Sequence, residues 1–303
     1  MDIVNRICGA MPAMLTPFTP DLHIDNEGQR RLVQFFLQNG VHGVVVLGST
    51  GEFQGARWEE RAHALATVVD EVDGKVPVIA GAGLPNLWAT IDQIKESADN
   101  GADAMLVTPP YYFPIGQDQI VDWFAKLVEA SPIPIMYYHF PRMTKLTADP
   151  DTIVRLREVG VVGVKDSGGN TGWLHSTLIR TRDYKDFKLL LGSDFHLVDA
   201  LINGADGCIG LPQNVVPHIS VQMYESFQSN NLSEANRLQK IAVDFLDALM
   251  ISPSGQPYAK GLLEKMGLCD RTVAPPFVNA TDGEIENLWE NVRELCRPPQ
   301  PAP

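Results

Sequence analysis

Short apolar runs recur along the chain, and each is followed by a loop and a longer segment with helical periodicity. Eight of these runs are candidate strands: AMPAMLTPF, GVVVLGS, VPVIAGAG, DAMLVTP, IPIMYYHF, VVGVKDS, FKLLLGSD and DGCIGLP. Runs that are apolar on successive residues are typical of parallel strands buried on both faces. Eight strand–helix units in succession therefore predict an α/β fold, a closed (β/α)8 TIM barrel.

The ends of three predicted helices support this fold. The dipeptides Asn39-Gly40, Asn100-Gly101 and Asn203-Gly204 each place a glycine just before a strand, where a left-handed residue would end the helix. The phrases NGVHGVVVLG, NGADAMLVTP and NGADGCIGLP look like copies of one strand–helix unit. A doubly wound open sheet is the alternative, but no GxGxxG turn follows the first strand.

After the eighth strand the pattern becomes purely helical, with expected helices at residues 231–250, 257–267 and 282–296. We therefore predict a barrel catalytic domain over residues 1–228 and a C-terminal helical extension over 229–296. The proline-rich tail, residues 297–303, is expected to be disordered.

Composition excludes several classes of function. A net charge of −13 without a basic cluster would repel nucleic acid. No apolar run approaches the roughly 18 residues that cross a membrane, and the N-terminal segment lacks the unbroken apolarity of a signal peptide. The four scattered cysteines indicate neither a zinc site nor a disulfide framework, so we expect a cytoplasmic protein.

Lys165 lies where the function of a barrel is expected, at the carboxyl end of a strand. Taking an ammonium group out of water costs on the order of several kcal/mol unless it is paired, and losing the proton avoids that cost. A neutral amine attacks ketones to form a Schiff base. The alternative is a lysine that reaches solvent or pairs with Asp166.

Tyr138 ends the preceding strand and is expected to face the same cavity as Lys165. A phenol there can relay protons between an imine, a substrate hydroxyl and water. The alternative is a core tyrosine, and because side chains alternate along a strand, only one of Tyr137 and Tyr138 can point inward. Tyr111 and Tyr112, after the fourth strand, are candidates for catalysis or for packing in an interface or lid.

The stretch GSTGE, residues 48–52, ends the second strand. Its glycines let backbone amides face a ligand, and Ser49 and Thr50 add hydroxyl donors, which together suit a carboxylate. The alternative is a tight turn in which Ser49 or Thr50 caps the next helix. Support for a metal site is thin, because the only candidate ligands near strand ends are His139 and the pair Asp194 and His196, without HxH or HExxH spacing.

Taken together, GSTGE, TPPYYF, YYHFP and GVKDSGG, in this order and each ending a strand, resemble the dihydrodipicolinate synthase/N-acetylneuraminate lyase family of class I, pyruvate-handling aldolases. The resemblance covers residues 10–296. It implies that Lys165 forms the Schiff base with a 2-oxo acid and that Tyr138 is the central proton relay. It also implies a homotetramer built from two dimers, with no metal and no organic cofactor.

The same resemblance assigns further residues. Ser49 and Thr50 would bind the pyruvyl carboxylate and continue the proton relay, and Tyr112 would reach into a neighbouring subunit's site. The remaining residues of the expected substrate-binding set are Gly48, Ser167, Gly192 and Ile209, of which Gly192 and Ile209 would line the pyruvyl pocket with their backbone.

The expected substrate depends on a departure from the family pattern. Dihydrodipicolinate synthases carry a YNVPSRT-like stretch whose arginine binds the second substrate's carboxylate, whereas here YHFPRMT places Met143 at that position and Arg142 one residue earlier. YYHFP and GSTGE resemble sialate lyase and 2-keto-3-deoxy sugar acid aldolases, whereas KDSGG and GEF resemble 4-hydroxy-2-oxoglutarate aldolases. We expect a lyase that reversibly cleaves a 4-hydroxy-2-oxo acid, a 2-keto-3-deoxy sugar acid, to pyruvate and an aldehyde. The alternatives are a synthase-like condensation, a dehydratase, a metal-dependent barrel hydrolase, or a non-catalytic barrel that binds oxo acids.

Overall fold

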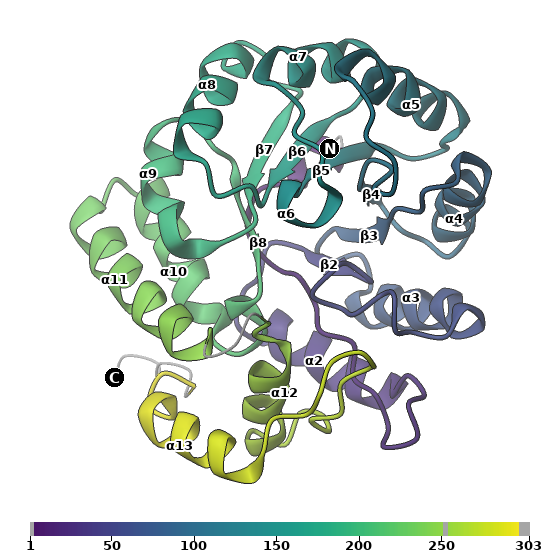
Figure 1. Ribbon diagram of the computed structural model, residues 1–303. Helices are drawn as coiled ribbons and strands as arrows, with labels where there is room; N and C mark the ends of the chain where they lie inside the picture. Colours follow the sequence, from purple (N-terminus) through teal and green to yellow (C-terminus); the bar gives the residue numbers. More distant parts are fainter. Residues whose placement is uncertain (1–2, 251–253, 297–303) are drawn as a thin grey trace.

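The computed structural model, which describes residues 3–250 and 254–296, contains a ring of eight parallel strands surrounded by helices (Figure 1). The strands are β1 (Gly9–Pro12), β2 (Val44–Val46), β3 (Val78–Ala82), β4 (Ala104–Val107), β5 (Ile135–His139), β6 (Gly163–Asp166), β7 (Lys188–Leu191) and β8 (Gly207–Gly210). Seven of them lie within the apolar runs singled out in the sequence, and β1 begins one residue before the first run. The predicted (β/α)8 barrel is therefore confirmed.

The helices alternate with the strands and continue beyond β8. Their bounds are α1 (Ile3–Arg6), α2 (Asn26–Gln38), α3 (Trp58–Val72), α4 (Leu87–Asp99), α5 (Gln117–Ala130), α6 (Pro141–Thr144), α7 (Pro150–Glu158), α8 (Thr171–Thr181), α9 (Leu197–Ile202), α10 (Pro217–Gln228), α11 (Leu232–Leu249), α12 (Gln256–Lys265) and α13 (Asp282–Val292). Two 3-10 turns, η1 (Asp194–His196) and η2 (Pro212–Asn214), follow β7 and β8. The sequence did not predict these turns, α1 or α6, because three or four residues are too few to display a period.

The sheet closes on itself between its first and last strands. β1 pairs in parallel with β8, and an isolated bridge from Ala13 to Val45 joins the end of β1 to β2. The buried Asn214 side chain reinforces this junction: its Oδ1 accepts from the Leu15 amide at 2.8 Å, and its Nδ2 donates to the Ala13 carbonyl at 2.9 Å. Closure leaves no free strand edge and brings the carboxyl ends of all eight strands to one rim, called the mouth below.

Side chains that alternate along the strands form two apolar layers. The inner layer fills the barrel and includes Met11, Val45, Ile79, Leu106, Met136, Tyr138, Leu190 and Ile209. The outer layer lies between the sheet and the helices and includes Val44, Val46, Tyr137 and Val164. Because both faces of each strand are buried, the strands read as continuous apolar runs in the sequence.

The three asparagine–glycine pairs end helices as expected. Gly40, Gly101 and Gly204 adopt φ angles of 73°, 87° and 101°, just after α2, α4 and α9. In this left-handed region a side chain would be strained, so glycine ends the helix without that cost.

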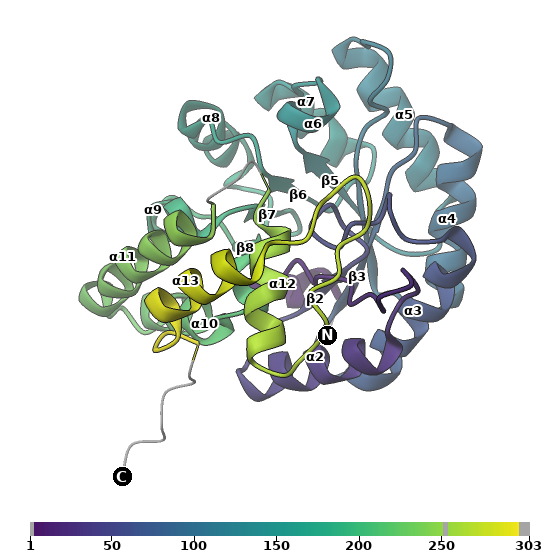
Figure 2. The same cartoon turned by 60° about the horizontal axis from the view of Figure 1, so that its bottom comes forward.

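The chain beyond β8 forms a C-terminal helical part, defined here as α11 to α13 with the loops between them. In both views α12 lies near α2 and α13 lies farther out (Figures 1 and 2). Arg31 of α2 donates to the Leu268 carbonyl just after α12 at 2.9 Å. The three expected helices are present with slightly shorter bounds. The division into domains at residue 228 stays a prediction, and the tail at 297–303 lies outside the described residues.

Among the described residues, none of the helices combines the length and the apolar character that crossing a bilayer requires. Cys8, Cys208, Cys269 and Cys296 are free thiols, and Cys8 is the least buried of them.

Candidate active site

Lys165 lies inside the barrel near its mouth. It is the penultimate residue of β6, which ends at Asp166, within the predicted run VVGVKDS. In the sheet register it stands opposite Tyr138 of β5 on one side and Leu190 of β7 on the other, both members of the inner layer. Its side chain is only 4% exposed. Strand alternation therefore delivers an amine into the barrel interior.

Tyr138 is the direct neighbour of this amine. Lys165 Nζ lies over the Tyr138 ring, 4.5 Å from its centroid, and Tyr138 is 5% exposed. Tyr137 points the other way, where its ring meets Phe124 of α5 edge-on at 5.1 Å and burial raises the pKa of its hydroxyl. Tyr138 is thus the inward tyrosine of the pair, and an amine and a phenol share one sheltered position.

Asp166 does not pair with Lys165. Its carboxylate accepts from the Gly168 amide and contacts His139 Nδ1, both at 2.8 Å, on the outer face of the sheet. The His139 ring stacks on Trp173 of α8 with centroids 3.9 Å apart. Within the described part of the chain Lys165 has no ion-pair partner, so the alternative of a salt bridge to Asp166 is wrong.

His139 is therefore a buried structural histidine. The other proposed metal pair also separates, since Asp194 is buried while His196 is exposed. No group of three or more potential metal ligands gathers anywhere in residues 3–250 or 254–296.

Ser167, Gly192 and Ile209 belong to the ends of β6, β7 and β8, on the same side of the barrel as Lys165. The Gly192 amide donates to the Asp166 carbonyl at 2.6 Å, and a Cβ at Gly192 would come within 1.9 Å of Ser167 Oγ. Ile209 of β8 is buried in the same inner layer as Tyr138. The structure therefore places Ser167 and Gly192 directly after β6 and β7, at the mouth, and Ile209 within β8. Only glycine leaves room for Ser167 beside β7.

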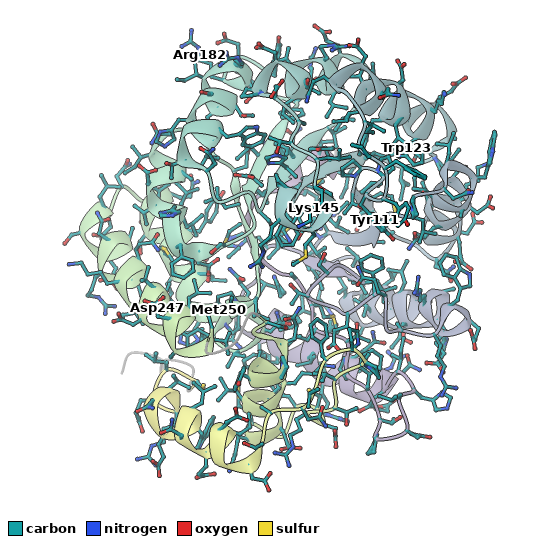
Figure 3. All side chains as sticks on the ribbon, viewed as in Figure 1. Tyr111, Trp123, Lys145, Arg182, Asp247 and Met250 are labelled. Atoms are coloured by element: carbon teal, nitrogen blue, oxygen red, sulfur yellow. The ribbon has the colours of Figure 1, made fainter. Side chains whose placement is uncertain are left out.

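A stack of side chains leads from Tyr138 to the surface. The Phe140 ring lies over Tyr138 with centroids 5.5 Å apart, and the Arg142 guanidinium lies 5.7 Å from the Phe140 ring centroid. Arg142 and Met143 both belong to α6, and Met143 is 56% exposed. Figure 1 draws α6 over the centre of the ring of strands, and Lys145, which follows α6, is labelled there in Figure 3. The stretch YHFPRMT therefore lies beside the mouth.

The GSTGE segment follows β2 at the same end of the barrel. Gly48, Ser49 and Thr50 are partly buried in a turn that the Glu52 amide closes by donating to the Ser49 carbonyl at 3.2 Å. Thr16, after β1, donates its hydroxyl to the Gly51 carbonyl at 2.6 Å. These hydrogen bonds hold the segment against the end of β1. They do not join it to Lys165 or Tyr138.

Tyr112 stands apart from the other predicted residues. It is 78% exposed in the loop between β4 and α5, and its ring meets the exposed Phe113 edge-on at 5.1 Å. Tyr111, in the same loop, is labelled beside the ring of strands in Figure 3. An exposed aromatic pair of this kind is typical of a surface that another molecule covers.

The sequence did not reveal a buried network behind β7 and β8. The fully buried Asp194 carboxylate accepts from Gln213 Nε2 at 2.7 and 2.9 Å and from the Ser220 hydroxyl at 2.5 Å. Burial raises the pKa of Asp194, against the effect of these donors. Gln239 of α11 also donates to the Asp194 backbone carbonyl. The network ties the end of β7 to η2, α10 and α11. The only signal in the sequence is a carboxylate just after an apolar strand.

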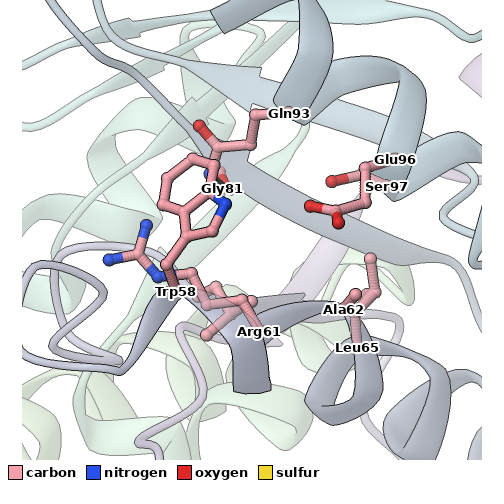
Figure 4. A pocket seen from close by; sticks show the side chains of 9 residues that line it. Trp58, Arg61, Ala62, Leu65, Gly81, Gln93, Glu96 and Ser97 are labelled. Carbon is pink, nitrogen blue, oxygen red and sulfur yellow. Dashed lines mark hydrogen bonds between the residues drawn. The ribbon is translucent and has the colours of Figure 1, made fainter. Parts of the chain in front are cut away.

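A pocket between α3 and α4 lies outside the barrel (Figure 4). It is lined by Trp58, Arg61, Glu96 and Ser97 together with Gln93, whose side chain donates to the Gly81 carbonyl at 3.4 Å. Its volume of about 10 Å³ has room for about one water molecule, so it is too small for a substrate.

Comparison with known proteins identifies the family. The family model described as "Dihydrodipicolinate synthetase family" matches residues 6–295, which is nearly the whole chain. The chain belongs to this family. The dihydrodipicolinate synthetase family comprises class I lyases that form a Schiff base between a lysine and the substrate, and this chain is a lyase of that class. The resemblance found in the sequence is confirmed at the level of the family.

Similar members of the family extend over the full length of the chain. A 4-hydroxy-tetrahydrodipicolinate synthase from Methanopyrus kandleri is 36% identical over 96% of this chain and 97% of its own. A solved monomeric dihydrodipicolinate synthase variant superposes with a TM-score of 0.91 at 29% identity, covering 97% of this chain and 98% of its own. A prophage protein of the family from E. coli K12, solved in complex with pyruvate, gives 0.89 at 26% identity over 95% and 98%.

Proposed function

We propose that the protein reversibly cleaves a 4-hydroxy-2-oxo acid, of the 2-keto-3-deoxy sugar acid class, into pyruvate and an aldehyde, with Lys165 as the Schiff-base lysine. The observation that carries the proposal is the Lys165 amine, sheltered within the barrel mouth, unpaired in the described chain and 4.5 Å from the Tyr138 ring centroid. A lysine kept from bulk water without a carboxylate partner is suited to condense with a ketone.

The reaction balances through an imine and an enamine. The Lys165 amine adds to the C2 ketone and loses water, giving a protonated imine. A base removes the proton of the C4 hydroxyl, the C3–C4 bond breaks, and its electron pair moves into the imine to give an enamine and the free aldehyde. Protonation of C3 and hydrolysis then release pyruvate and restore the amine.

The other predicted residues receive roles around this step. Tyr138 takes and returns the proton of the substrate hydroxyl. Ser49 and Thr50 bind the pyruvyl carboxylate with their hydroxyls and amides, next to Gly48, and Thr50 passes protons to Tyr138. The remaining members of the set, Ser167, Gly192 and Ile209, line the pyruvyl pocket. No metal or organic cofactor is required by this chemistry.

We further propose a cytoplasmic homotetramer, a dimer of dimers, in which Tyr112 reaches into a neighbouring subunit's site. The exposure of Tyr112 and Phe113 supports a covered aromatic loop. Free thiols at every described cysteine suit a reducing compartment. Neither nucleic acid nor a membrane is an expected partner at a net charge of −13.

A synthase-like condensation of pyruvate with an aldehyde is the second candidate, because similar relatives are named 4-hydroxy-tetrahydrodipicolinate synthase. Met143, at the position where synthases carry their carboxylate-binding arginine, argues against it. A dehydratase would use the same lysine, whereas a barrel that only binds oxo acids would turn none over.

The test is a substrate panel with two readouts. The protein is incubated with 2-keto-3-deoxy sugar acids of different length and stereochemistry, and free pyruvate and aldehyde are measured together. We expect equal amounts of both products from at least one acid. Loss of water without release of pyruvate would instead identify a dehydratase, and an absence of turnover throughout the panel would contradict the proposal.

A further inference from the structure

A buried ion pair links the GSTGE segment to the C-terminal helical part. Lys260 of α12 places its Nζ 2.7 Å from Glu52 Oε1, and the two side chains are 0% and 1% exposed. Lys260 Nζ also donates to the Thr272 carbonyl at 2.7 Å and lies 4.3 Å from the Phe18 ring centroid. The ammonium group thus meets a carboxylate, a carbonyl and an aromatic face without solvent.

The carboxylate of this pair is held from a second side. Glu52 Oε2 accepts from the Ala274 amide at 2.7 Å, in the loop between α12 and α13. Burial raises the pKa of Glu52 and lowers that of Lys260, and the charge of each residue opposes the effect on the other. Removing either partner would leave the other as an uncompensated buried charge or force it to become neutral.

Glu52 closes the turn that contains Ser49 and Thr50. Its amide donates to the Ser49 carbonyl at 3.2 Å, its carbonyl accepts from the Gly55 amide at 2.8 Å, and its φ angle is 54°. A left-handed glutamate is strained backbone that the surrounding contacts must hold in place. Lys260 and Ala274 fix the side chain of this residue, and the turn is fixed with it.

Stability alone is a weak reason for a buried ion pair, because desolvation offsets much of the attraction between the charges. The hydrogen bonds and the ion pair of Glu52 and Lys260, however, hold both side chains in one geometry. We infer that Glu52 and Lys260 are positioning residues: through them the C-terminal helical part holds Ser49 and Thr50 in the arrangement that receives the carboxylate of the 2-oxo acid. The inference rests on the proposed function, which makes Ser49 and Thr50 the carboxylate-binding residues.

The test compares two carbonyl compounds that differ in charge. Borohydride trapping at Lys165 is followed with pyruvate and with its neutral methyl ester, by peptide mass spectrometry, as a function of ligand concentration. For Lys260→Met, at fixed low concentration, we expect trapping of pyruvate to fall at least tenfold and trapping of the ester to change less than twofold. Lys265→Met, on the same helix but in an exposed ion pair with Glu286, should resemble the wild type.

Glu52→Gln is the second variant, because it keeps the side-chain size and an acceptor for the Ala274 amide. It should show the same selective loss for pyruvate, at least threefold, even if Lys260→Met fails to fold. Equal losses for both compounds, or no loss for either, would overturn the inference while leaving the proposed function intact. If the wild type traps neither compound at Lys165, the proposed function falls, and the inference falls with it.

Discussion

Lys165 and Tyr138 stand opposite each other on the adjacent strands β6 and β5, with the Lys165 amine 4.5 Å from the centre of the Tyr138 ring. Their side chains must share the barrel interior because paired residues on neighbouring parallel strands face the same side of the sheet. The two groups that the proposed reaction needs, a nucleophile and a proton relay, are thus brought together by strand register.

Tyr138→Phe should lower kcat for lyase turnover about 100-fold or more, since positioned acid–base groups typically contribute that much. The imine should still form, so borohydride should still trap pyruvate at Lys165, although more slowly. Steady-state kinetics combined with trapping separates the two effects. An unchanged kcat would show that another group carries the proton.

Tyr137→Phe is the matched control on the same strand. The Tyr137 hydroxyl is buried without a hydrogen-bond partner in the described chain, and it faces the helices. Its removal should leave kcat unchanged and alter the free energy of unfolding by less than about 1 kcal/mol, or stabilise the fold, because no bond is lost. A large loss of activity would mean that the two tyrosines do not divide their roles as the structure indicates.

The sequence was sufficient for the barrel and for the inward lysine. Strands buried on both faces leave continuous apolar runs, and the glycines after α2, α4 and α9 mark helix ends by the conformation they alone adopt easily. Lys165 could be predicted as a functional residue because burying an ammonium group at the end of an apolar strand is costly. The sequence predicts that Tyr138 faces the cavity, and the structure places it there. Alternation by itself requires only that Tyr137 and Tyr138 face opposite sides, because it does not fix the register.

The sequence did not predict contacts between side chains that lie far apart along the chain. Lys260 lies in an apolar helical stretch, PYAKGLLEK, and nothing local indicates that it meets Glu52 from the loop after β2. The partners of Asp194 likewise come from segments after β8. The outward turn of Asp166 toward His139 also depends on the position of α8. Such pairs are set by the packing of whole elements, for which a single sequence carries no periodic signal.

Met143→Arg should shift the choice of aldehyde toward acceptors with a carboxylate. Met143 is exposed on α6, beside the stack of Phe140 on Tyr138. A guanidinium at this position would reach the mouth and could form two parallel hydrogen bonds with the carboxylate of such an aldehyde. We expect kcat/KM for condensation of pyruvate with a carboxylate-bearing aldehyde to rise about tenfold, as one charge-assisted contact allows. Arg142→Met is the comparison. If it abolishes wild-type activity toward such an aldehyde, then Arg142 already holds that carboxylate and Met143 does not set the preference.

Stability should fall with acidification through His42. Burial lowers the pKa of its ring below the ordinary value of 6.5, and the opposing effect of Glu225 is smaller. The Ala10 amide donates to His42 Nδ1 at 3.2 Å, which a neutral ring accepts. As the pH falls below 6.5, His42 binds a proton in the unfolded chain, whereas in the folded protein its ring stays neutral to lower pH. The stability that His42 contributes to the folded state is therefore present above pH 6.5 and is lost as the pH falls below it. The free energy of unfolding in urea should therefore fall more on acidification for the wild type than for His42→Gln. Parallel pH profiles of the two proteins would contradict this.

The most direct test of the account is to map the site of borohydride reduction in the presence of pyruvate. We predict one carboxyethyl adduct per chain, on the peptide that contains Lys165, and no adduct in Lys165→Ala, while Lys260 and the surface lysines remain unmodified in both. An adduct on any other lysine, or an unmodified Lys165 at saturating pyruvate, would contradict the assignment of Lys165 as the Schiff-base residue.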